Sequence, residues 1–187
     1  MGIPGPALSK PAFAQRIAVV GAVGCGKSTL AGVLARRWRL PHVELDAIYF
    51  GPNWEKASDQ VFYDEVVRHA GGSEWVIDGN YEAVRDIVWV RAQVLLWLDY
   101  PLRIVLWRLS KRTLKRLLAR EVFASGNREH LRRLVGSQSI LWWAIRSHGP
   151  RRRQFEQLLS GTRYAHLKVM RFHSPDEMTV WLEGTHD

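Results

Sequence analysis

The sequence is poor in cysteine and has no long apolar run. The 187 residues include one cysteine, so no disulfide can form within the chain. No uninterrupted apolar stretch approaches the roughly 18 residues that a membrane-spanning helix needs. The first residues also lack the apolar core of a signal peptide. We therefore expect an intracellular protein that resides in the cytoplasm.

Acidic residues are scarce in one part of the chain. Residues 103–153 contain twelve arginines and two lysines against two glutamates, a net charge of +12, whereas the whole chain carries +9. The basic character therefore belongs to this segment. A localised positive field attracts polyanions, so we expect either a nucleoside triphosphate or a nucleic acid as its partner.

The rest of the composition is that of a globular domain, with 47% hydrophobic residues and nine tryptophans. We expect a flexible N-terminal arm over 1–15 and a single domain over 16–187. Short apolar runs alternate with helical patterns, which predicts an α/β fold with a parallel sheet covered by helices on both faces. The predicted strands are 16–21, 42–45, 74–78, 93–99 and 165–172. The predicted helices are 27–39, 58–71, 101–120, 141–159 with an interruption near 149–150, and 175–184.

The stretch GAVGCGKST matches the phosphate-loop pattern G-x-x-x-x-G-K-[ST] and lies between a predicted strand and a predicted helix. Gly21, Gly24 and Gly26 allow the backbone to curl so that its amide groups face one point. The start of the following helix adds its positive end. Lys27 supplies a mobile charge for the β- and γ-phosphates, so we expect ATP as the ligand.

Three other residues of this loop have expected roles. Ser28 offers a hydroxyl to Mg²⁺, and Thr29 is expected to reach the α-phosphate. Cys25 also belongs to the loop, and two roles are possible for its side chain. It is either a small side chain that the loop tolerates or a thiol activated at a helix N-terminus and open to oxidation.

A phosphate loop also needs an acid to hold the waters of the metal. Asp78 ends the third predicted strand, which lies beside the loop strand in sheets of this type, so we expect Asp78 to face Ser28 and Mg²⁺. Asp99, at the end of the fourth strand, is the alternative. Its other reading is a cap for the helix that opens at Pro101.

The acceptor is expected on the other side of the loop, in an insertion over about 46–73. Asp46 ends the second strand and is predicted to orient the acceptor hydroxyl or to act as general base. Its alternative role is to cap the loop that follows. Trp54 in that loop, with Asn80 and Tyr81 after the third strand, is also expected to contact the acceptor.

The acceptor side is acidic. Residues 40–78 contain only Lys56 and Arg68 as fixed positive charges, beside eight acids. A monophosphate acceptor would require arginine there. The composition therefore favours a neutral or cationic hydroxyl compound, unless arginines reach over from the basic segment.

Arginines recur every four residues in the basic segment, which places them on one stripe of a helix. These are Arg108, Arg112, Arg116 and Arg120. Like charges at this spacing destabilise a helix, so a phosphate partner would offset their repulsion. We predict a lid over about 108–153 in which Arg112 and Arg116 stabilise charge on the transferring phosphoryl group. A nucleic-acid surface and a solvated helix face are the alternatives.

Five stretches together resemble the DNA topology modulation proteins, P-loop kinases similar to adenylate and shikimate kinases. They are GAVGCGKSTL, VELDAIYFGPNW, WVIDGNY, VLLWLDYPLRIVLWRLSKR and RRRQFEQLL. The resemblance covers 16–183 and implies a five-stranded sheet of order 2-3-1-4-5, a lid after the fourth strand, and binding of ATP and Mg²⁺. By position, Asp78-Gly79 resembles the Asp-Gly of adenylate kinase. Asn80-Tyr81 departs from the Pro-Arg pair that follows it there.

Two functions follow from these patterns. The first is an ATP- and Mg²⁺-dependent phosphotransferase acting on a nucleotide or a small hydroxyl compound. The second is an ATP-binding regulator whose basic segment contacts DNA.

Overall fold

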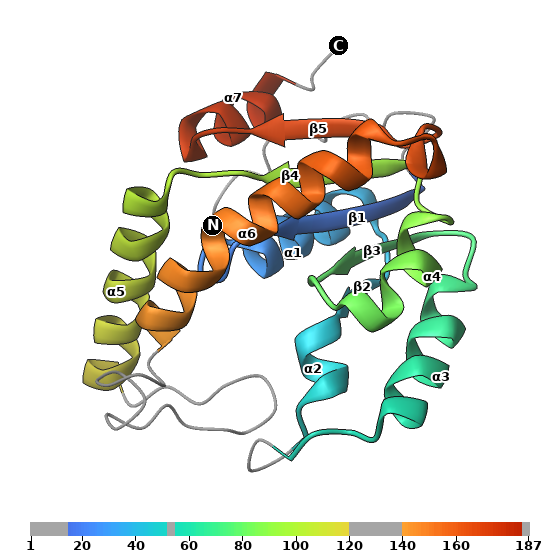
Figure 1. Cartoon of the computed structure of the whole chain (residues 1–187), viewed down its shortest axis with the longest axis horizontal. Coiled ribbons are helices and arrows are strands. Elements are labelled where there is room, and N and C mark those ends of the chain that lie inside the picture. The colour runs from blue at the N-terminus through green and yellow to red at the C-terminus, as the bar shows by residue number, and fades with distance from the viewer. Residues whose placement is uncertain (1–14, 52–54, 120–139, 185–187) are drawn as a thin grey trace, which may run out of the picture.

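The structure is a computed structural model that describes residues 15–51, 55–119 and 140–184, with the side chains of 115–119 outside the description. Its centre is a parallel sheet of five strands in the order β2-β3-β1-β4-β5, which confirms the predicted order (Figure 1). The strands are β1 (Arg16–Gly21), β2 (His42–Glu44), β3 (Trp75–Asp78), β4 (Val94–Leu98) and β5 (Lys168–Phe172).

Helices connect the strands and cover both faces of the sheet (Figure 1). They are α1 (Lys27–Trp38), α2 (Leu45–Tyr49), α3 (Asp59–Ala70), α4 (Arg85–Trp89), α5 (Leu102–Ala119), α6 (Ile140–Ser160) and α7 (Pro175–Gly184). Two short 3-10 helices, η2 (Glu82–Val84) and η4 (Thr162–Tyr164), complete the described elements. In this part of the chain, no helix combines the length and apolar character that crossing a bilayer requires.

Two hydrophobic clusters hold the helices to the sheet. Every residue of β3 and β4 is buried, because a parallel strand is covered on both faces. On one face α1 contributes Leu30, Leu34 and Trp38, joined by residues of α5 and α7. On the other face, α3, α4 and α6 pack around aromatic side chains that include Phe155. The loops that follow the strands therefore lie together at the carboxyl ends of the strands, which is where parallel sheets bind their ligands.

Three boundaries differ from the expectations. The loop expected after the second strand begins as helix α2, closed by a bond from Phe50 N to Asp46 O at 3.0 Å. Helix α6 continues through Pro150, where we expected an interruption. Proline removes one backbone hydrogen bond, but the burial of Ala144 and Phe155 on either side retains the helix. Strand β5 begins at Lys168, since residues 165–167 form a turn that follows η4.

Candidate active site

The phosphate loop joins β1 to α1 and has a shape that requires glycine. Gly24 has φ +74°, and a Cβ there would lie 3.0 Å from Cδ1 of Leu109. Gly26 has φ +103°, and its Cβ would lie 3.0 Å from Nη2 of Arg108. Helix α1 begins without a side-chain cap from the described residues, so the amide groups of its first turn face the loop. The result is a concave backbone surface suited to phosphate.

Lys27 and Cys25 differ in what they offer a ligand. Lys27 Nζ donates to the carbonyl of Ala22 at 3.1 Å, which folds the ammonium over the loop. Cys25 is 1% exposed. Burial raises the pKa of its thiol, more strongly than the charge of Lys27 lowers it. The thiol is therefore protonated and buried, which favours the reading of Cys25 as a small side chain that the loop tolerates.

Asp78 lies beside the start of α1, as its strand position predicts. Ser28 Oγ donates to Asp78 Oδ2 at 2.7 Å, and Asp78 pairs in register with Val19 of the loop strand. Thr29 follows Ser28 and is exposed. This contact places Ser28 next to Asp78, the two residues expected to hold the metal. Their role as metal ligands stays a prediction.

Two residues near Asp78 were not expected in the site. His42 Nε2 lies 2.9 Å from Asp78 Oδ1. Glu44 is in register with Asp78 on the neighbouring strand. Burial, and then the charge of Asp78, raise the pKa of the Glu44 carboxyl. The signal in the sequence was a pair of acids two residues apart, with Glu44 at the end of β2 and Asp46 at the start of α2.

The turn after β3 connects the phosphate loop with the acceptor side. Asn80 Oδ1 accepts from Gly21 N at 3.2 Å, and Asn80 Nδ2 donates to Gly21 O. Both ends of the Asn80 amide thus bond to the loop, and the contact with the acceptor that we expected of Asn80 stays a prediction. Tyr81 does reach the acceptor side, where its hydroxyl donates to Asp46 Oδ1 at 2.7 Å. Burial, followed by the charge of Asp46, raises the pKa of Tyr81.

Asp46 itself lies in the first turn of α2 and is exposed. The carboxylate is thus tethered through one oxygen and open to solvent. Trp54, the other acceptor contact expected from this insertion, lies outside the described residues.

Arginine is present on the acceptor side, contrary to the composition of 40–78. The Arg85 side chain is 14% exposed, and its Nη2 lies 3.4 Å from Glu82 Oε1. Gln154 of α6 donates to the same oxygen at 2.6 Å, which ties α6 to η2. Helix packing therefore adds positive charge that the local sequence lacks.

Arg151 precedes Gln154 by three residues and so shares its face of α6. The guanidinium stacks on Trp143, 5.2 Å from the ring centre. Burial lowers the pKa of Arg151, and the charges of Glu82 and Asp46 oppose this effect. In the described part of the chain, no carboxylate lies at ion-pair distance from it. A half-buried cation of this kind is suited to an anionic ligand.

The arginine stripe meets the phosphate loop one turn earlier than expected. Arg108 lies against Gly26 and stacks on Tyr100, with Cζ 5.9 Å from the ring centre. Arg112, which we expected to be catalytic, follows one turn later and is half-buried. The side chain of Arg116 lies outside the description. The structure therefore adds Arg108 to the residues that can meet a bound phosphate.

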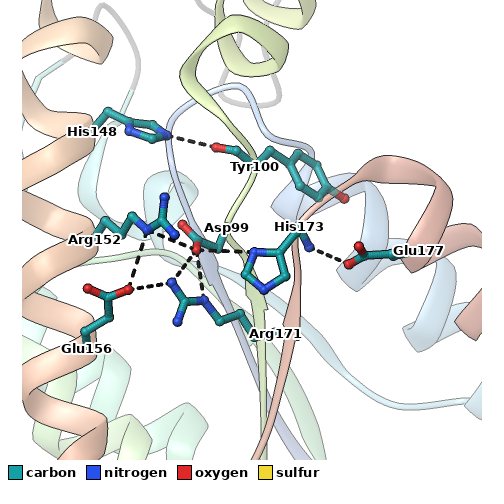
Figure 2. Close-up of polar contacts among 8 residues, drawn as sticks. All are labelled: Asp99, Tyr100, His148, Arg152, Glu156, Arg171, His173 and Glu177. Carbon is teal, nitrogen blue, oxygen red and sulfur yellow. Dashed lines mark hydrogen bonds and ion pairs between the residues drawn. The ribbon is translucent and has the colours of Figure 1, made fainter.

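Asp99 lies in a cluster of ion pairs between α6 and the sheet (Figure 2). Its Oδ2 accepts from Nε and Nη2 of Arg171 at 2.8 and 2.6 Å, and Arg152 Nε lies 3.3 Å away. His148 is 2.9 Å from the carbonyl of Tyr100. Asp99 therefore anchors α6 and is not placed to serve the metal. Its other expected role, as a cap for the helix that opens at Pro101, stays a prediction.

Comparison with known proteins defines the fold. No family model matches the chain, and no curated protein matches it by sequence. Among solved structures, a shikimate kinase from Bacteroides thetaiotaomicron is 14% identical with a TM-score of 0.55, over 91% of this chain and 95% of that chain. A gluconokinase from Sinorhizobium meliloti is 17% identical with a TM-score of 0.51, over 92% of each chain. The chain has the P-loop kinase fold.

Proposed function

We propose that the protein is a phosphotransferase that uses ATP and Mg²⁺ to phosphorylate a small hydroxyl compound. One observation carries the proposal: a single turn, residues 78–81, contacts Ser28, the phosphate loop and Asp46. The residues expected to bind the phosphate donor and the residues expected to bind the acceptor therefore lie together at the carboxyl ends of the strands. The kinase fold supports the same conclusion.

The donor side fits a nucleoside triphosphate with its metal. The backbone cradle at Gly21, Gly24, Cys25 and Gly26, with Lys27, would hold the phosphates, and Thr29 would add a hydroxyl. Ser28 and Asp78 would hold Mg²⁺, which neutralises charge on the phosphates when bound. The described residues contain no group of three His, Cys, Asp or Glu able to hold a metal alone. This fits a metal that shares its ligands with phosphate oxygens and water.

The acceptor side fits a hydroxyl held by Asp46. Tyr81 occupies one carboxylate oxygen of Asp46, and the other would accept the acceptor hydroxyl as hydrogen-bond partner or general base. Arg151 supplies positive charge near Asp46. The preferred acceptor in this proposal therefore carries a carboxylate or a phosphate in addition to its hydroxyl, and Trp54 stays a predicted contact.

Lid arginines would act on the transferring group. Arg108 is the one that the loop contacts, with Arg112 and Arg116 as further predicted members of the set. Arginine at such a position stabilises charge that develops in phosphoryl transfer.

Enzyme assays with matched variants test the proposal. ATP turnover is measured with a panel of hydroxy acids, sugar phosphates, nucleotides and their neutral analogues, beginning with shikimate and gluconate, the compounds named in the two structural neighbours. We expect one class of acceptor to stimulate turnover, and Lys27→Ala to abolish the stimulation. Lys168→Ala, an exposed lysine at the far edge of the sheet, is the control. Absence of stimulation across the panel would contradict the proposal.

The charge of 103–153 favours one second candidate, a regulator that binds nucleic acid as the resemblance to DNA topology modulation proteins suggests. Arg103, Lys111, Arg146, Arg152 and Arg153 are exposed on α5 and α6. DNA affinity that falls steeply with salt and survives Lys27→Ala would support this candidate.

A further inference from the structure

The carboxylate of Asp78 is buried and held from two sides. Asp78 is 3% exposed. Its Oδ2 accepts from Ser28 of α1 at 2.7 Å, and its Oδ1 lies 2.9 Å from His42 Nε2 of β2. Burying a carboxylate is costly unless its oxygens are hydrogen-bonded. Each oxygen of Asp78 therefore depends on a side chain from a different element.

The register of β2 and β3 places His42 on the same face of the sheet as Asp78. His42 pairs with Val76, and Glu44 pairs with Asp78. Alternate residues of a strand share a face, so His42, Glu44, Val76 and Asp78 all face α1. The imidazole lies against Gly32 of that helix, with Cε1 and Nδ1 each 3.9 Å from where a Cβ would stand. The ring is thus held between a strand and a helix with Nε2 directed at Asp78.

The hydrogen bond has one possible direction when Asp78 is ionised. An ionised carboxylate only accepts, so Nε2 of His42 carries the hydrogen. Both the neutral Nε2–H tautomer and the charged imidazolium meet this requirement. The contact therefore does not depend on the protonation state of His42.

Loss of this donor would free the carboxylate to turn. Glu44 is the neighbouring acid, and its pKa is raised by burial and by the charge of Asp78. Without His42, Asp78 Oδ1 would face that acid with no donor, and rotation about the side chain would move Oδ2 away from Ser28. The pair expected to hold the metal would lose its alignment.

We infer that His42 is a positioning residue that fixes the Asp78 carboxylate for the metal of the bound nucleotide. The inference rests on the proposed role of Asp78 in the phosphotransferase. His42 acts through Asp78 and has no contact with the reacting groups in this account. Partners of this kind commonly affect metal affinity by about 10- to 100-fold.

Two variants of similar length separate the hydrogen bond from the packing. His42→Gln retains an N–H near the position of Nε2, whereas His42→Met fills similar space without a donor. His69→Met is the matched control, since His69 of α3 is 31% exposed against 20% for His42. The affinity of Mn²⁺ for the complex with a non-hydrolysable ATP analogue is measured by electron paramagnetic resonance. Affinity for the analogue in EDTA and the melting temperature are measured alongside.

We expect His42→Met to weaken Mn²⁺ binding by about 10-fold, with analogue affinity in EDTA close to that of the wild type. His42→Gln should restore most of the Mn²⁺ affinity, and His69→Met should resemble the wild type. Should His42→Met fail to fold, His42→Asn, whose amide is too short to reach Oδ1, takes its place with the same expectation. Wild-type Mn²⁺ affinity in the donor-free variant, or an equal loss in His42→Gln, would overturn the inference.

The binding assay needs no acceptor and no turnover. If no acceptor stimulates the enzyme but Mn²⁺ affinity depends on the His42 donor, the positioning role stands while the proposed reaction fails. If an acceptor is found and Mn²⁺ affinity is insensitive to His42, the reverse conclusion holds.

Discussion

Asn80 bonds through its side-chain amide to both the N–H and the C=O of Gly21. Asn80, two residues after the end of β3, thereby holds the first glycine of the phosphate loop, 59 positions earlier in the chain. We expect Asn80→Ala to lower the free energy of unfolding by about 1–3 kcal/mol, because it leaves two backbone groups without their partner. Urea unfolding measures the change.

The same variant should also weaken binding of an ATP analogue, since the loop loses its lateral support. Asn80→Asp is the informative control, because it retains the acceptor for Gly21 N but replaces the donor to Gly21 O with a negative charge. We expect it to be at least as harmful as Asn80→Ala. Analogue affinity that is equal in all three proteins would show that the loop does not need Asn80.

Arg108 should affect turnover more than binding. The guanidinium lies against Gly26, where it can meet a bound phosphate. Replacing such a cation with Gln costs about 100- to 1,000-fold in kcat when it stabilises the transition state. Arg103→Gln, an exposed position on the same helix, controls for the change in net charge. Steady-state kinetics with the stimulating acceptor provide the measurement, and an unchanged kcat in Arg108→Gln would exclude this role.

Arg151 should determine which acceptors bind. If it pairs with an anionic group, Arg151→Gln should raise the KM of a charged acceptor by about 10- to 100-fold, the equivalent of one charge-assisted contact. The KM of the corresponding neutral amide should change little. Arg153→Gln, exposed on the same helix, is the control. Equal effects on charged and neutral acceptors would contradict a role in anion recognition.

Glu156 gives the structure a pH-dependent contact. The hydrogen bond from Arg171 is the main cause that lowers the pKa of Glu156 below its ordinary 4.5, so the ionised form stabilises the fold. This contribution is present above pH 4.5 and is lost as the pH falls through the lower pKa of the folded state. We expect Glu156→Gln to lower the melting temperature at pH 7.

The difference in melting temperature between Glu156→Gln and the wild type should close on acidification, in the window below pH 4.5. Glu183→Gln, at an exposed position of α7, is the matched control and should track the wild type at every pH. A difference that persists unchanged at pH 3 would show that Glu156 acts through packing and not through its charge.

The local sequence was sufficient to predict where the strands and the phosphate loop lie along the chain. The runs that became β3 and β4 are continuously apolar because both faces are covered. Asp78 reached Ser28 because β3 lies beside β1, a neighbour relation that the fold resemblance supplied. The structure confirmed the order of strands, and the metal role of this pair stays a prediction.

Contacts across the fold could not be predicted from spacing. The period of four residues predicts the stripe of α5 that carries Arg108 and Arg112. It does not predict which helical turn of this stripe meets the phosphate loop, because that depends on how α5 packs on Gly24. Arg151 lies 70 residues beyond Tyr81 in sequence, and the docking of α6 on η2 brings its guanidinium near Tyr81 and the charge of Asp46. The composition of 40–78 cannot include arginines that other parts of the chain bring to this region.

The turn of residues 78–81 has a thermodynamic consequence. Asn80 and Tyr81 are adjacent and Tyr81 bonds to Asp46, so an acceptor that bound at Asp46 and ordered Tyr81 would also stiffen the peptide that holds Gly21. The peptide ordered by the first ligand would then already be ordered when the second ligand binds. By linkage, the affinity for nucleotide would rise in the presence of acceptor by the same factor as the affinity for acceptor rises in the presence of nucleotide. If both ligands bind as proposed, the short connection would make their binding cooperative.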